Sequence, residues 1–356
     1  MAPIGLYLHV PFCATRCPYC DFFTQRPVGD ALTVYAETMK TELRDTRDKQ
    51  ICADSVYFGG GTPSVLPGDL FSGLLDTVRE CFTVTPDAEI TVECNPSSDL
   101  ERFLPAAAEA GVDRVSLGMQ SAVDAERRKL GRTSDRKRVE EALSIARKNG
   151  IDNLTLDVML GVPGQTLHSL QETLQFLVDS GVPHVSAYML KLEEGTVFYK
   201  RADSLDLPGE ELVGDMYLQT IETLEAAGLR QYEISNFARP GFESRHNLKY
   251  WHCEEYLGLG PSAHSFFRGE RFYRKPDWDA FVAGEPVIPD GPGGSFEERL
   301  MLALRLTEGY RGKIPPELRE KASQPMLRPF LEVGDDSIRL TKEGFLVSNT
   351  VIAELL

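Results

Sequence analysis

The 356-residue sequence lacks the features that would place it in a membrane, outside the cell or on nucleic acid. It has no long apolar run, and no basic region precedes an apolar stretch at its start, so we expect neither a membrane span nor a signal peptide. It also lacks an excess of basic residues. The formal net charge of −16 leaves no basic surface for phosphates and argues against a nucleic-acid partner. These absences predict a cytoplasmic protein.

Cysteines are few and unevenly distributed. There are seven, an odd number, and three of them fall between Cys13 and Cys20. A secreted disulfide framework has an even number of spaced cysteines, so this pattern favours a metal centre in a reducing compartment. We expect the remaining thiols to be core or incidental residues. They are Cys52, Cys81, Cys94 and Cys253.

Short β-rich runs alternate with amphipathic stretches through the first two thirds of the chain. The predicted strands are Leu6–Val10, Ser55–Phe58, Glu89–Glu93, Arg114–Leu117, Leu154–Met159 and Val185–Met189. The predicted helices are Ala31–Arg47, Leu70–Cys81, Leu100–Ala110, Arg136–Lys148, Leu167–Asp179 and Leu212–Ala227. Several of these helices end at a glycine, and Ser98 with Glu101 predicts a capping box.

Six strand–helix units in series predict an α/β fold with a parallel sheet and helices outside it. Because the runs are short, apolar and β-branched, we expect the strands to be buried on both faces. Six units are two short of a closed barrel, so residues 1–228 are expected to form an open, partial (βα)6 TIM-like barrel. In such folds the functional residues gather where the strands end.

The rhythm breaks after Gly228. Residues 229–290 are rich in aromatic residues and glycine and predict a junction. Residues 291–356 predict a small C-terminal α+β domain of winged-helix type: helices, a hairpin of Ile338–Leu340 with Gly344–Val347, and a terminal helix. The sequence shows no internal repeat beyond the strand–helix alternation.

Cys13, Cys17 and Cys20 follow the first predicted strand, on a loop that Pro11 and Pro18 prevent from being continuous helix. Thiolates at these spacings can converge on one soft-metal centre. Three ligands are one fewer than a structural zinc or an electron-transfer cluster normally has, and they leave one iron of a [4Fe–4S] cluster open. A zinc site completed by His9, or free thiols, are the simpler alternatives.

Polar residues stand where the other strands should stop. Strand two runs into Gly59, Gly60, Gly61 and Thr62, where missing side chains allow close backbone approach. Glu93, Gln120 and Asp157 occupy corresponding positions, and Arg132 could bind a carboxylate. A charge within an apolar strand is costly unless it is paired or bound. Asp157 is therefore expected either to bind a ligand or to pair with a buried basic residue.

The cysteine loop resembles the signature of the radical S-adenosylmethionine superfamily, with Tyr19 before the third cysteine and the preceding Tyr7–Cys13 segment also matching. The resemblance implies a [4Fe–4S] cluster whose open iron chelates the methionyl group of S-adenosylmethionine, and whose electron cleaves the sulfonium. Gly60, Gly61, Thr62, Glu93, Gln120, Arg132 and Asp157 match cofactor-binding positions of the coproporphyrinogen-dehydrogenase branch. Tyr7 and Tyr19 belong to the same cofactor-binding set.

Within that branch the sequence resembles the heme chaperones more than the decarboxylating enzyme. The enzyme has a fourth cysteine where this chain has Phe22, and a long N-terminal extension where this chain reaches its first strand by residue 5. The run of His246, Tyr250 and Trp251 is similar to the chaperones' His-Asn-x-x-Tyr-Trp motif. An imidazole can ligate heme iron and aromatic rings can stack on a porphyrin.

The simpler explanation of that motif is that His246 forms hydrogen bonds at the junction while Tyr250 and Trp251 fill its core. Other candidate heme ligands nearby are His252, Cys253 and His264. The resemblance implies a chaperone that binds heme and passes it to acceptor apoproteins such as respiratory enzymes, with dimerisation and transient membrane association, and no catalytic residue is assigned. The alternatives are oxidative decarboxylation of coproporphyrinogen III and a radical reaction on an unrelated substrate.

Overall fold

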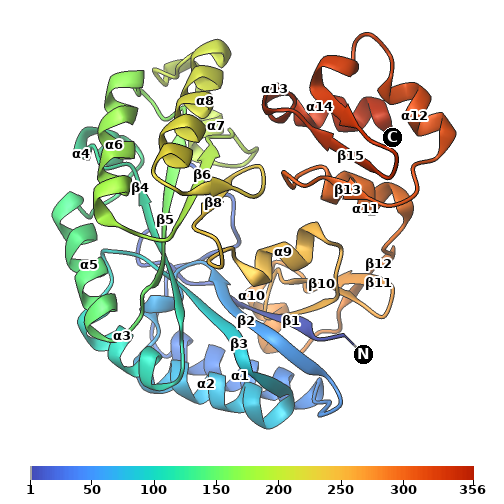
Figure 1. The fold of residues 1–356 in the computed structure, drawn as a ribbon. Coiled ribbons are helices and arrows are strands. Elements are labelled where there is room, and N and C mark those ends of the chain that lie inside the picture. Colours follow the sequence, from blue (N-terminus) through green and yellow to red (C-terminus); the bar gives the residue numbers. More distant parts are fainter. Residues whose placement is uncertain (1) are drawn as a thin grey trace.

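The computed structural model describes residues 2–356. Its central feature is a run of six parallel strands in chain order, with helices on the outer side of the sheet (Figure 1). The strands are β1 (Ile4–Val10), β2 (Cys52–Gly60), β3 (Thr83–Cys94), β4 (Arg114–Gln120), β5 (Asn153–Leu160) and β6 (His184–Met189). Every predicted strand is confirmed. The open, partial TIM-like barrel is confirmed with them.

The helices between these strands also match the prediction. The long ones are α1 (Ala31–Asp45), α2 (Gly68–Cys81), α3 (Leu100–Glu109), α5 (Arg136–Lys148), α6 (Leu167–Ser180) and α8 (Glu210–Ala226). Shorter ones are α4 (Asp124–Lys129), α7 (Val197–Lys200), η1 (Pro63–Val65) and η2 (Ala202–Ser204). Gly181 ends α6 in the left-handed conformation at φ +68°, as the glycine pattern predicts.

The predicted capping box at the start of α3 is wrong. Asp99 occupies the N-cap without a side-chain bond, and the Ser98 hydroxyl instead accepts a hydrogen bond from Ser64 at 2.9 Å. A capping box does form at α6, where the side chains of Thr166 and Ser169 satisfy each other's backbone N–H groups. Ser98 thus links the loop after β3 to the loop after β2 through this hydrogen bond.

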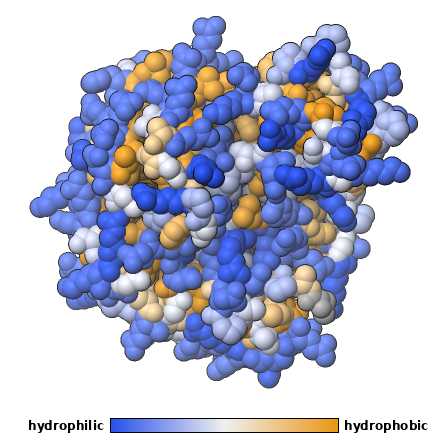
Figure 2. All heavy atoms as spheres, viewed as in Figure 1, coloured by the Kyte–Doolittle hydropathy of each residue, from blue (hydrophilic) through white to orange (hydrophobic). Residues whose placement is uncertain are grey.

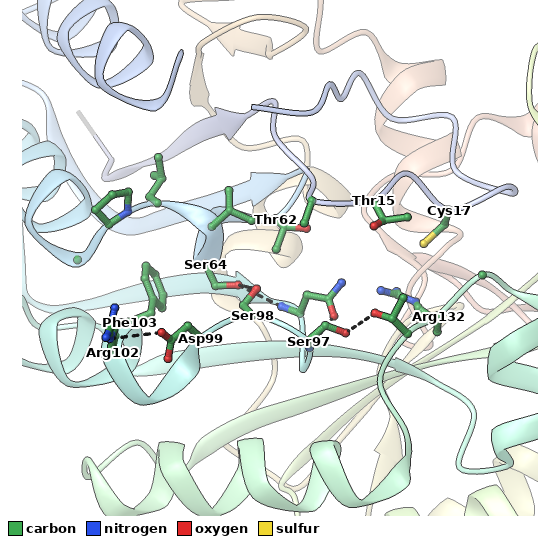
Figure 3. A pocket seen from close by; sticks show the side chains of 18 residues that line it. Thr15, Cys17, Thr62, Ser64, Ser97, Ser98, Asp99, Arg102, Phe103 and Arg132 are labelled. Carbon is green, nitrogen blue, oxygen red and sulfur yellow. Dashed lines mark hydrogen bonds and ion pairs between the residues drawn. The ribbon is translucent and has the colours of Figure 1, made fainter. Parts of the chain in front are cut away.

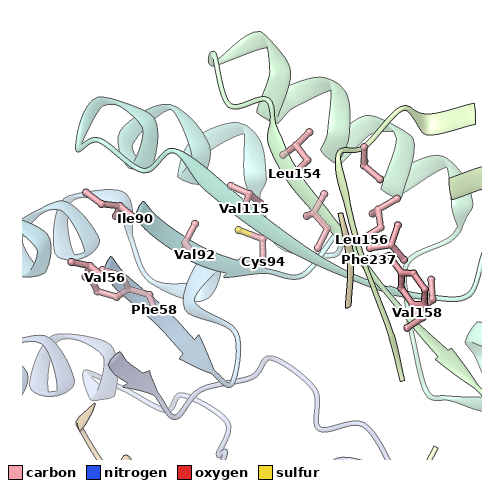
Figure 4. Close-up of a cluster of buried hydrophobic side chains, with 14 of the residues drawn as sticks. Val56, Phe58, Ile90, Val92, Cys94, Val115, Leu154, Leu156, Val158 and Phe237 are labelled. Carbon is pink, nitrogen blue, oxygen red and sulfur yellow. The ribbon is translucent and has the colours of Figure 1, made fainter. Parts of the chain in front are cut away.

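The two faces of the sheet differ. The face toward the helices is apolar, and Val56, Phe58 and Val92 belong to its buried cluster (Figure 4). The inner face carries polar side chains at alternate positions, among them Ser116 and Asp157. The strands are buried on both faces, as expected, but the buried inner face is polar. Asp157 is not an isolated charge in an apolar strand, because it lies on a polar face.

The segment after β6 extends the sheet at both edges. β7 (Arg230–Gln231) and β8 (Asn236–Ala238) lie beyond β6, and β8 pairs antiparallel with it. Helix α9 (Arg245–Trp251) then leads to β9 (Tyr256–Leu259), which pairs parallel with β1 at the other edge. The remaining elements are β10 (His264–Phe267), β11 (Glu270–Tyr273), α10 (Trp278–Val282) and β12 (Ile288–Pro292). The result is a 12-stranded open sheet.

The C-terminal part is α+β and lies beside the barrel (Figure 1). It contains α11 (Phe296–Ala303), β13 (Tyr310–Arg311), α12 (Pro316–Ala322), η3 (Arg328–Phe330), β14 (Leu331–Val333), β15 (Ser337–Leu340), α13 (Lys342–Leu346) and α14 (Ser348–Leu355). The predicted hairpin is misplaced. β15 pairs with β14, which precedes it, and the following residues turn into α13 because Thr341 caps the Gly344 N–H.

The molecular surface in view is mainly hydrophilic, with hydrophobic residues in small separate groups (Figure 2). None of the helices within residues 2–356 combines the length and the apolar character that crossing a membrane requires.

Candidate functional site

The cysteine loop connects β1 to α1 and is attached at both ends of its span. The Cys13 N–H donates to the Gln25 carbonyl at 3.0 Å, and the Phe198 N–H donates to the Pro18 carbonyl, also at 3.0 Å. The Tyr19 ring packs against Phe198 at a centroid distance of 6.2 Å. The loop therefore bridges the top of the sheet from its first strand to the segment after β6.

The three loop cysteines are free thiols, each partly exposed. Burial raises the pKa of Cys13 and of Cys20, and the Cys13 sulfur lies 3.3 Å from the Thr62 hydroxyl. All three border the same cavity. Thiol sulfurs around one open space form the donor set that an iron–sulfur cluster requires.

The cysteines do not converge as ligands of a single metal ion. Across residues 2–356, no three His, Cys, Asp or Glu side chains gather closely enough to hold one. His9 is also engaged, since its ring nitrogens pair with the Tyr7 hydroxyl and the Phe23 carbonyl, each at 3.0 Å. A cluster has several irons, so each thiolate binds its own metal atom and the sulfurs need not converge. The donor set fits a cluster better than a zinc ion.

The glycines after β2 are required by the chain itself. Gly60 adopts φ +102°, and a Cβ there would overlap the His9 ring. A Cβ on Gly61 would lie 2.6 Å from the Phe12 carbonyl oxygen. The Thr62 N–H donates to that same oxygen at 2.7 Å. The missing side chains thus let the end of β2 support the start of the cysteine loop.

Glu93 lies at the end of β3, where its carboxylate accepts hydrogen bonds from the Tyr57 hydroxyl at 2.8 Å and the Gly60 N–H at 3.1 Å. Burial raises the pKa of Glu93 to about 7, although both hydrogen bonds oppose this. A buried carboxylate ionises more easily when a cation or a hydrogen-bond donor lies next to it. Glu93 is therefore suited to bind a cationic or hydroxyl group of a ligand.

Asp157 on β5 accepts from the Ser116 hydroxyl at 2.9 and 3.1 Å, one distance to each carboxylate oxygen. Burial raises its pKa, and the carboxylate forms no ion pair within residues 2–356. The buried basic residue next to it, Arg114, donates to the Thr155 hydroxyl instead, at 2.7 Å. Arg114 and Arg132 attract the Asp157 carboxylate and oppose the rise of its pKa, but neither forms a direct ion pair with it among the described residues.

Arg132 follows α4 and borders the cavity beside Cys17 and Tyr19 of the cysteine loop. Its Nε is buried and has no hydrogen-bond partner among the described residues. Burial alone would lower the pKa of Arg132, but the neighbouring Tyr19 and Cys17 outweigh this and raise it. A buried guanidinium with an unused N–H beside a cavity fits a carboxylate ligand.

Gln120 ends β4 in a conformation that side chains rarely adopt, at φ +72°, although it is buried. Its amide oxygen accepts a hydrogen bond from the Tyr188 hydroxyl at 2.9 Å. Such backbone strain persists only where the surroundings enforce it, and it is concentrated at binding sites.

One cavity of about 390 Å³ brings these residues together. Its lining includes Cys13, Cys17, Cys20, Tyr19, Gly60, Gly61, Thr62, Glu93, Gln120, Arg132 and Asp157. Tyr7 is not among its lining residues and borders an adjacent cavity instead. The sequence analysis missed Tyr57, Arg114, Ser116, Ser186 and Asn247, which also line it. Most of them could have been predicted from the polar residues that occur at every second position along each strand.

A second opening of about 450 Å³ lies on the outer side of the cysteine loop (Figure 3). Thr62, Ser64, Ser97 and Ser98 line it, with Ser64 hydrogen-bonded to Ser98, and Cys17 and Arg132 border one end. Cys17 and Arg132 thus line both spaces, and this side of the loop is accessible from outside.

The structure places His246 in a buried position away from the cavity surface. It lies on α9 and faces β2. The Ser55 hydroxyl contacts its Nδ1 at 2.9 Å, and the Tyr250 hydroxyl contacts its Nε2 at 2.7 Å. Burial lowers its pKa to about 3, and the ring stacks on Tyr57 at 5.1 Å. Both nitrogens are occupied, so ligation of iron would break one of these bonds. Trp251 is partly buried at the end of α9.

The motif instead forms the floor of the site. The backbone N–H of His246 donates to Glu89 on β3 at 3.1 Å, and Asn247 lines the cavity from below. The helix packs against β1 and β2, and its first backbone N–H groups bond Glu89 on β3. Sequence positions almost 200 residues apart are thereby fixed against each other.

Comparison with known proteins agrees with this arrangement. The radical SAM superfamily profile matches residues 7–177. The structure of coproporphyrinogen III oxidase (HemN) from Escherichia coli, a radical SAM enzyme, superposes with a TM-score of 0.85 over 99% of this chain and 90% of that one. At 21% identity this likeness shows the fold alone. The fold and the cysteine-lined cavity are those of a radical SAM protein.

Within that class, most of the similar curated proteins carry one name, heme chaperone HemW. Heme chaperone HemW of Mycobacterium tuberculosis (strain H37Rv) is 35% identical over 99% of this chain and 95% of its own length. Heme chaperone HemW of Bacillus subtilis (strain 168) is 32% identical over 98% of each. The Escherichia coli (strain K12) protein of the same name is 34% identical over 74% of this chain and 70% of its own length. The chain belongs to the HemW family.

Proposed function

We propose that this protein is a heme chaperone that binds heme and delivers it to acceptor proteins such as respiratory enzymes. The observation that carries the proposal is the similarity to heme chaperones over 99% of the chain at 35% identity. Phe22, where the decarboxylating relative has cysteine, supports it. Heme would be cargo here, and the barrel cavity would hold the resident cofactors.

The residues of the barrel cavity support a [4Fe–4S] cluster and S-adenosylmethionine. Cys13, Cys17 and Cys20 would bind three irons, and the cluster when bound supplies an open iron and an electron. Arg132 would hold the methionyl carboxylate through its unused N–H groups. The acidic pair Glu93 and Asp157 would hold the ammonium or ribose hydroxyls, with each carboxylate already oriented by a hydroxyl donor.

The second candidate function is oxidative decarboxylation of coproporphyrinogen III. The Escherichia coli enzyme shares the fold over 99% of this chain, and a shared fold is compatible with either function. Phe22 opposes it, since it removes the thiol that the resemblance assigns to the enzyme, and its side chain is 58% exposed beside the loop.

One experiment separates the two functions. The full-length chain is reconstituted anaerobically with iron and sulfide and divided for a hemin titration and for a turnover assay with coproporphyrinogen III, S-adenosylmethionine and a reductant. The chaperone function predicts a saturable Soret shift at about one heme per chain and no protoporphyrinogen. Absence of the Soret shift contradicts it, and protoporphyrinogen as product establishes the enzyme. The same preparation gives the oligomeric state by size-exclusion chromatography, where we expect a homodimer.

A further inference from the structure

A third cavity, of about 460 Å³, lies directly beside the cofactor cavity. The two share Phe22, Gly60 and Glu93 as lining residues, so this cavity reaches the edge of the cysteine loop. Its walls are unusually aromatic for a site on a polar sheet face. The aromatic lining residues are Tyr7, Phe22, Phe23, Tyr250 and Tyr256.

His264, at the start of β10, stands at this cavity and is exposed. Its ring stacks on Tyr273 of β11, with centroids 5.1 Å apart and planes at 18°. Among residues 2–356 no side chain or backbone group forms a hydrogen bond with the imidazole. Stacking therefore fixes the ring while both nitrogens stay free.

The other histidines of this region differ in that respect. His9 and His246 have both ring nitrogens occupied, and His252 pairs with Glu308 at 3.1 Å. A free imidazole nitrogen is the common protein ligand of heme iron. His264 offers one without the loss of an existing contact.

We propose that heme binds in this aromatic cavity, with His264 as its axial ligand. The inference rests on the proposed chaperone function and names the site of that function. The aromatic walls present ring faces and edges to a flat apolar ligand. A volume of about 460 Å³ falls within the range of ligand pockets, which is about 300–1,000 Å³.

The surrounding charges set the orientation of heme and favour its release. Asp21 and Glu93 line the cavity, and no Lys or Arg does so within residues 2–356. The heme propionates are therefore expected to point out of the cavity into solvent. A single protein ligand leaves the opposite axial position of the iron open, where an acceptor protein can bind during transfer.

A different cavity offers the main competing ligand. It measures about 880 Å³ and lies between α8 and α13, with Met189 in an apolar lining rimmed by acidic residues. A thioether can also be an axial ligand. Met189 therefore serves as the comparison in the test.

The test is hemin titration of the full-length chain, followed by Soret absorbance, for wild type and the variants His264→Ala, His252→Ala and Met189→Ala. We expect His264→Ala to weaken binding by about tenfold or more and to shift the Soret band, while the two controls stay within about twofold. Added imidazole should restore the wild-type spectrum of His264→Ala. Unchanged circular dichroism shows that the variant is folded.

Three outcomes count against the inference, and each has a distinct meaning. If wild type binds no hemin, the proposed function fails together with the site. If wild type binds and His264→Ala matches it, the site fails while the proposed function stands. If Met189→Ala alone loses the spectrum, heme occupies the cavity beside α13 instead.

Discussion

At the scale of single residues, the site is a set of buried ionisable groups that existing hydrogen bonds only partly satisfy. Glu93 accepts from Tyr57 and Gly60, and Asp157 accepts from Ser116. Arg132 retains an unused Nε–H. Burying such groups costs free energy in the empty protein. A bound zwitterion would offset that cost for both kinds of group, because its ammonium would meet the carboxylates and its carboxylate would meet Arg132.

Replacing Glu93 with Gln should stabilise the empty protein at alkaline pH. Unfolded chains release the Glu93 proton near its ordinary pKa of 4.5, and the folded protein releases it near pKa 7. Between these values the folded state binds more protons, so stability falls as pH rises. We expect Glu93→Gln to raise the unfolding free energy at pH 8 by about 1–3 kcal/mol and to change it little near pH 4.

Urea unfolding at the two pH values measures this difference. The matched control is Glu109→Gln, because Glu109 is exposed at the end of α3 and forms no hydrogen bond or ion pair among the described residues. Lower stability of Glu93→Gln at pH 8 would show that the hydrogen bonds from Tyr57 and Gly60 outweigh the burial of the charge.

Replacing Cys17 with Ala should abolish cluster assembly. The remaining Cys13 and Cys20 leave only two thiolates on the cysteine loop, too few to hold a cube of four irons. Iron and sulfide content after anaerobic reconstitution, with the visible absorbance, measures the effect. Cys52→Ala is the control, since Cys52 is partly exposed at the start of β2, away from the cavity. Full iron content in Cys17→Ala would remove it from the ligand set.

The sequence gives a good account of residues whose signal is local. The cysteine spacing, the strand ends and the resemblance to the radical S-adenosylmethionine superfamily together predict eleven lining residues of the cavity without any structure. Tyr57, Arg114 and Ser116 escape notice because they alternate with apolar residues inside short runs that look like core. Their inward direction depends on the sheet register, which pairs Ser116 with Glu93 and with Thr155.

At the scale of elements, the end of β2 and the cysteine loop form one packed unit. Gly61 shows this most directly, because a Cβ would lie 2.6 Å from the Phe12 carbonyl oxygen and 2.7 Å from that of Val10. Both obstacles are backbone atoms and cannot rotate away. The glycine thus fixes how closely the metal-binding loop approaches the sheet.

Gly61→Ala should therefore lower the unfolding free energy by about 1–3 kcal/mol, the usual cost of overpacking, and reduce iron incorporation as well. Denaturant unfolding and iron analysis measure the two effects. Gly209→Ala is the control, because Gly209 has an ordinary φ of −67° and nothing within 4 Å of its added Cβ. Normal stability and iron content in Gly61→Ala would contradict the packing argument.

Helix α9 presents the opposite case, in which a local motif has a long-range structural use. Its His246 contacts Ser55 on β2, and its backbone contacts Glu89 on β3. No local pattern reveals that a helix near residue 250 packs against strands formed by residues 52–94. The sequence leaves two roles open for His246, iron ligation and internal hydrogen bonding. Only the fold shows that its ring nitrogens bond Ser55 and Tyr250.

His246→Ala should lower the unfolding free energy by about 2–4 kcal/mol, because it removes a buried ring and leaves the Ser55 and Tyr250 hydroxyls without a partner. The Soret band of the folded, hemin-loaded variant should match that of wild type. His252→Ala, at the exposed C-cap of the same helix, should change stability little. Loss of the heme spectrum with unchanged stability would restore His246 as the iron ligand.

At the scale of the whole molecule, the C-terminal part shares its core with the barrel. One continuous cluster of buried residues includes Leu8 and Leu156 of the barrel and also Leu300, Ile338 and Phe345. Helix α13 contacts α8, and Lys342 pairs with Glu225 across the same boundary at 2.9 Å. The predicted domain division at residue 291 falls within β12, and the shared core continues across it.

Because the core is continuous, a substitution that destabilises the C-terminal part should also destabilise the barrel. Ile338 is fully buried in the three-stranded sheet, and Ile338→Ala should cost about 2–4 kcal/mol. Both tryptophans, Trp251 and Trp278, lie outside this part of the chain, so their fluorescence reports on the barrel side.

If the two parts unfold as one cooperative unit, the fluorescence midpoint of Ile338→Ala in denaturant falls by the same amount as the midpoint from circular dichroism. Val115→Ala, in the barrel core, is the matched control and should shift both signals together. Should the fluorescence transition of Ile338→Ala stay at the wild-type midpoint while part of the dichroism signal is lost early, the C-terminal part unfolds by itself. The cofactor barrel would then be stable without it, and the boundary at residue 291 would separate two independent domains.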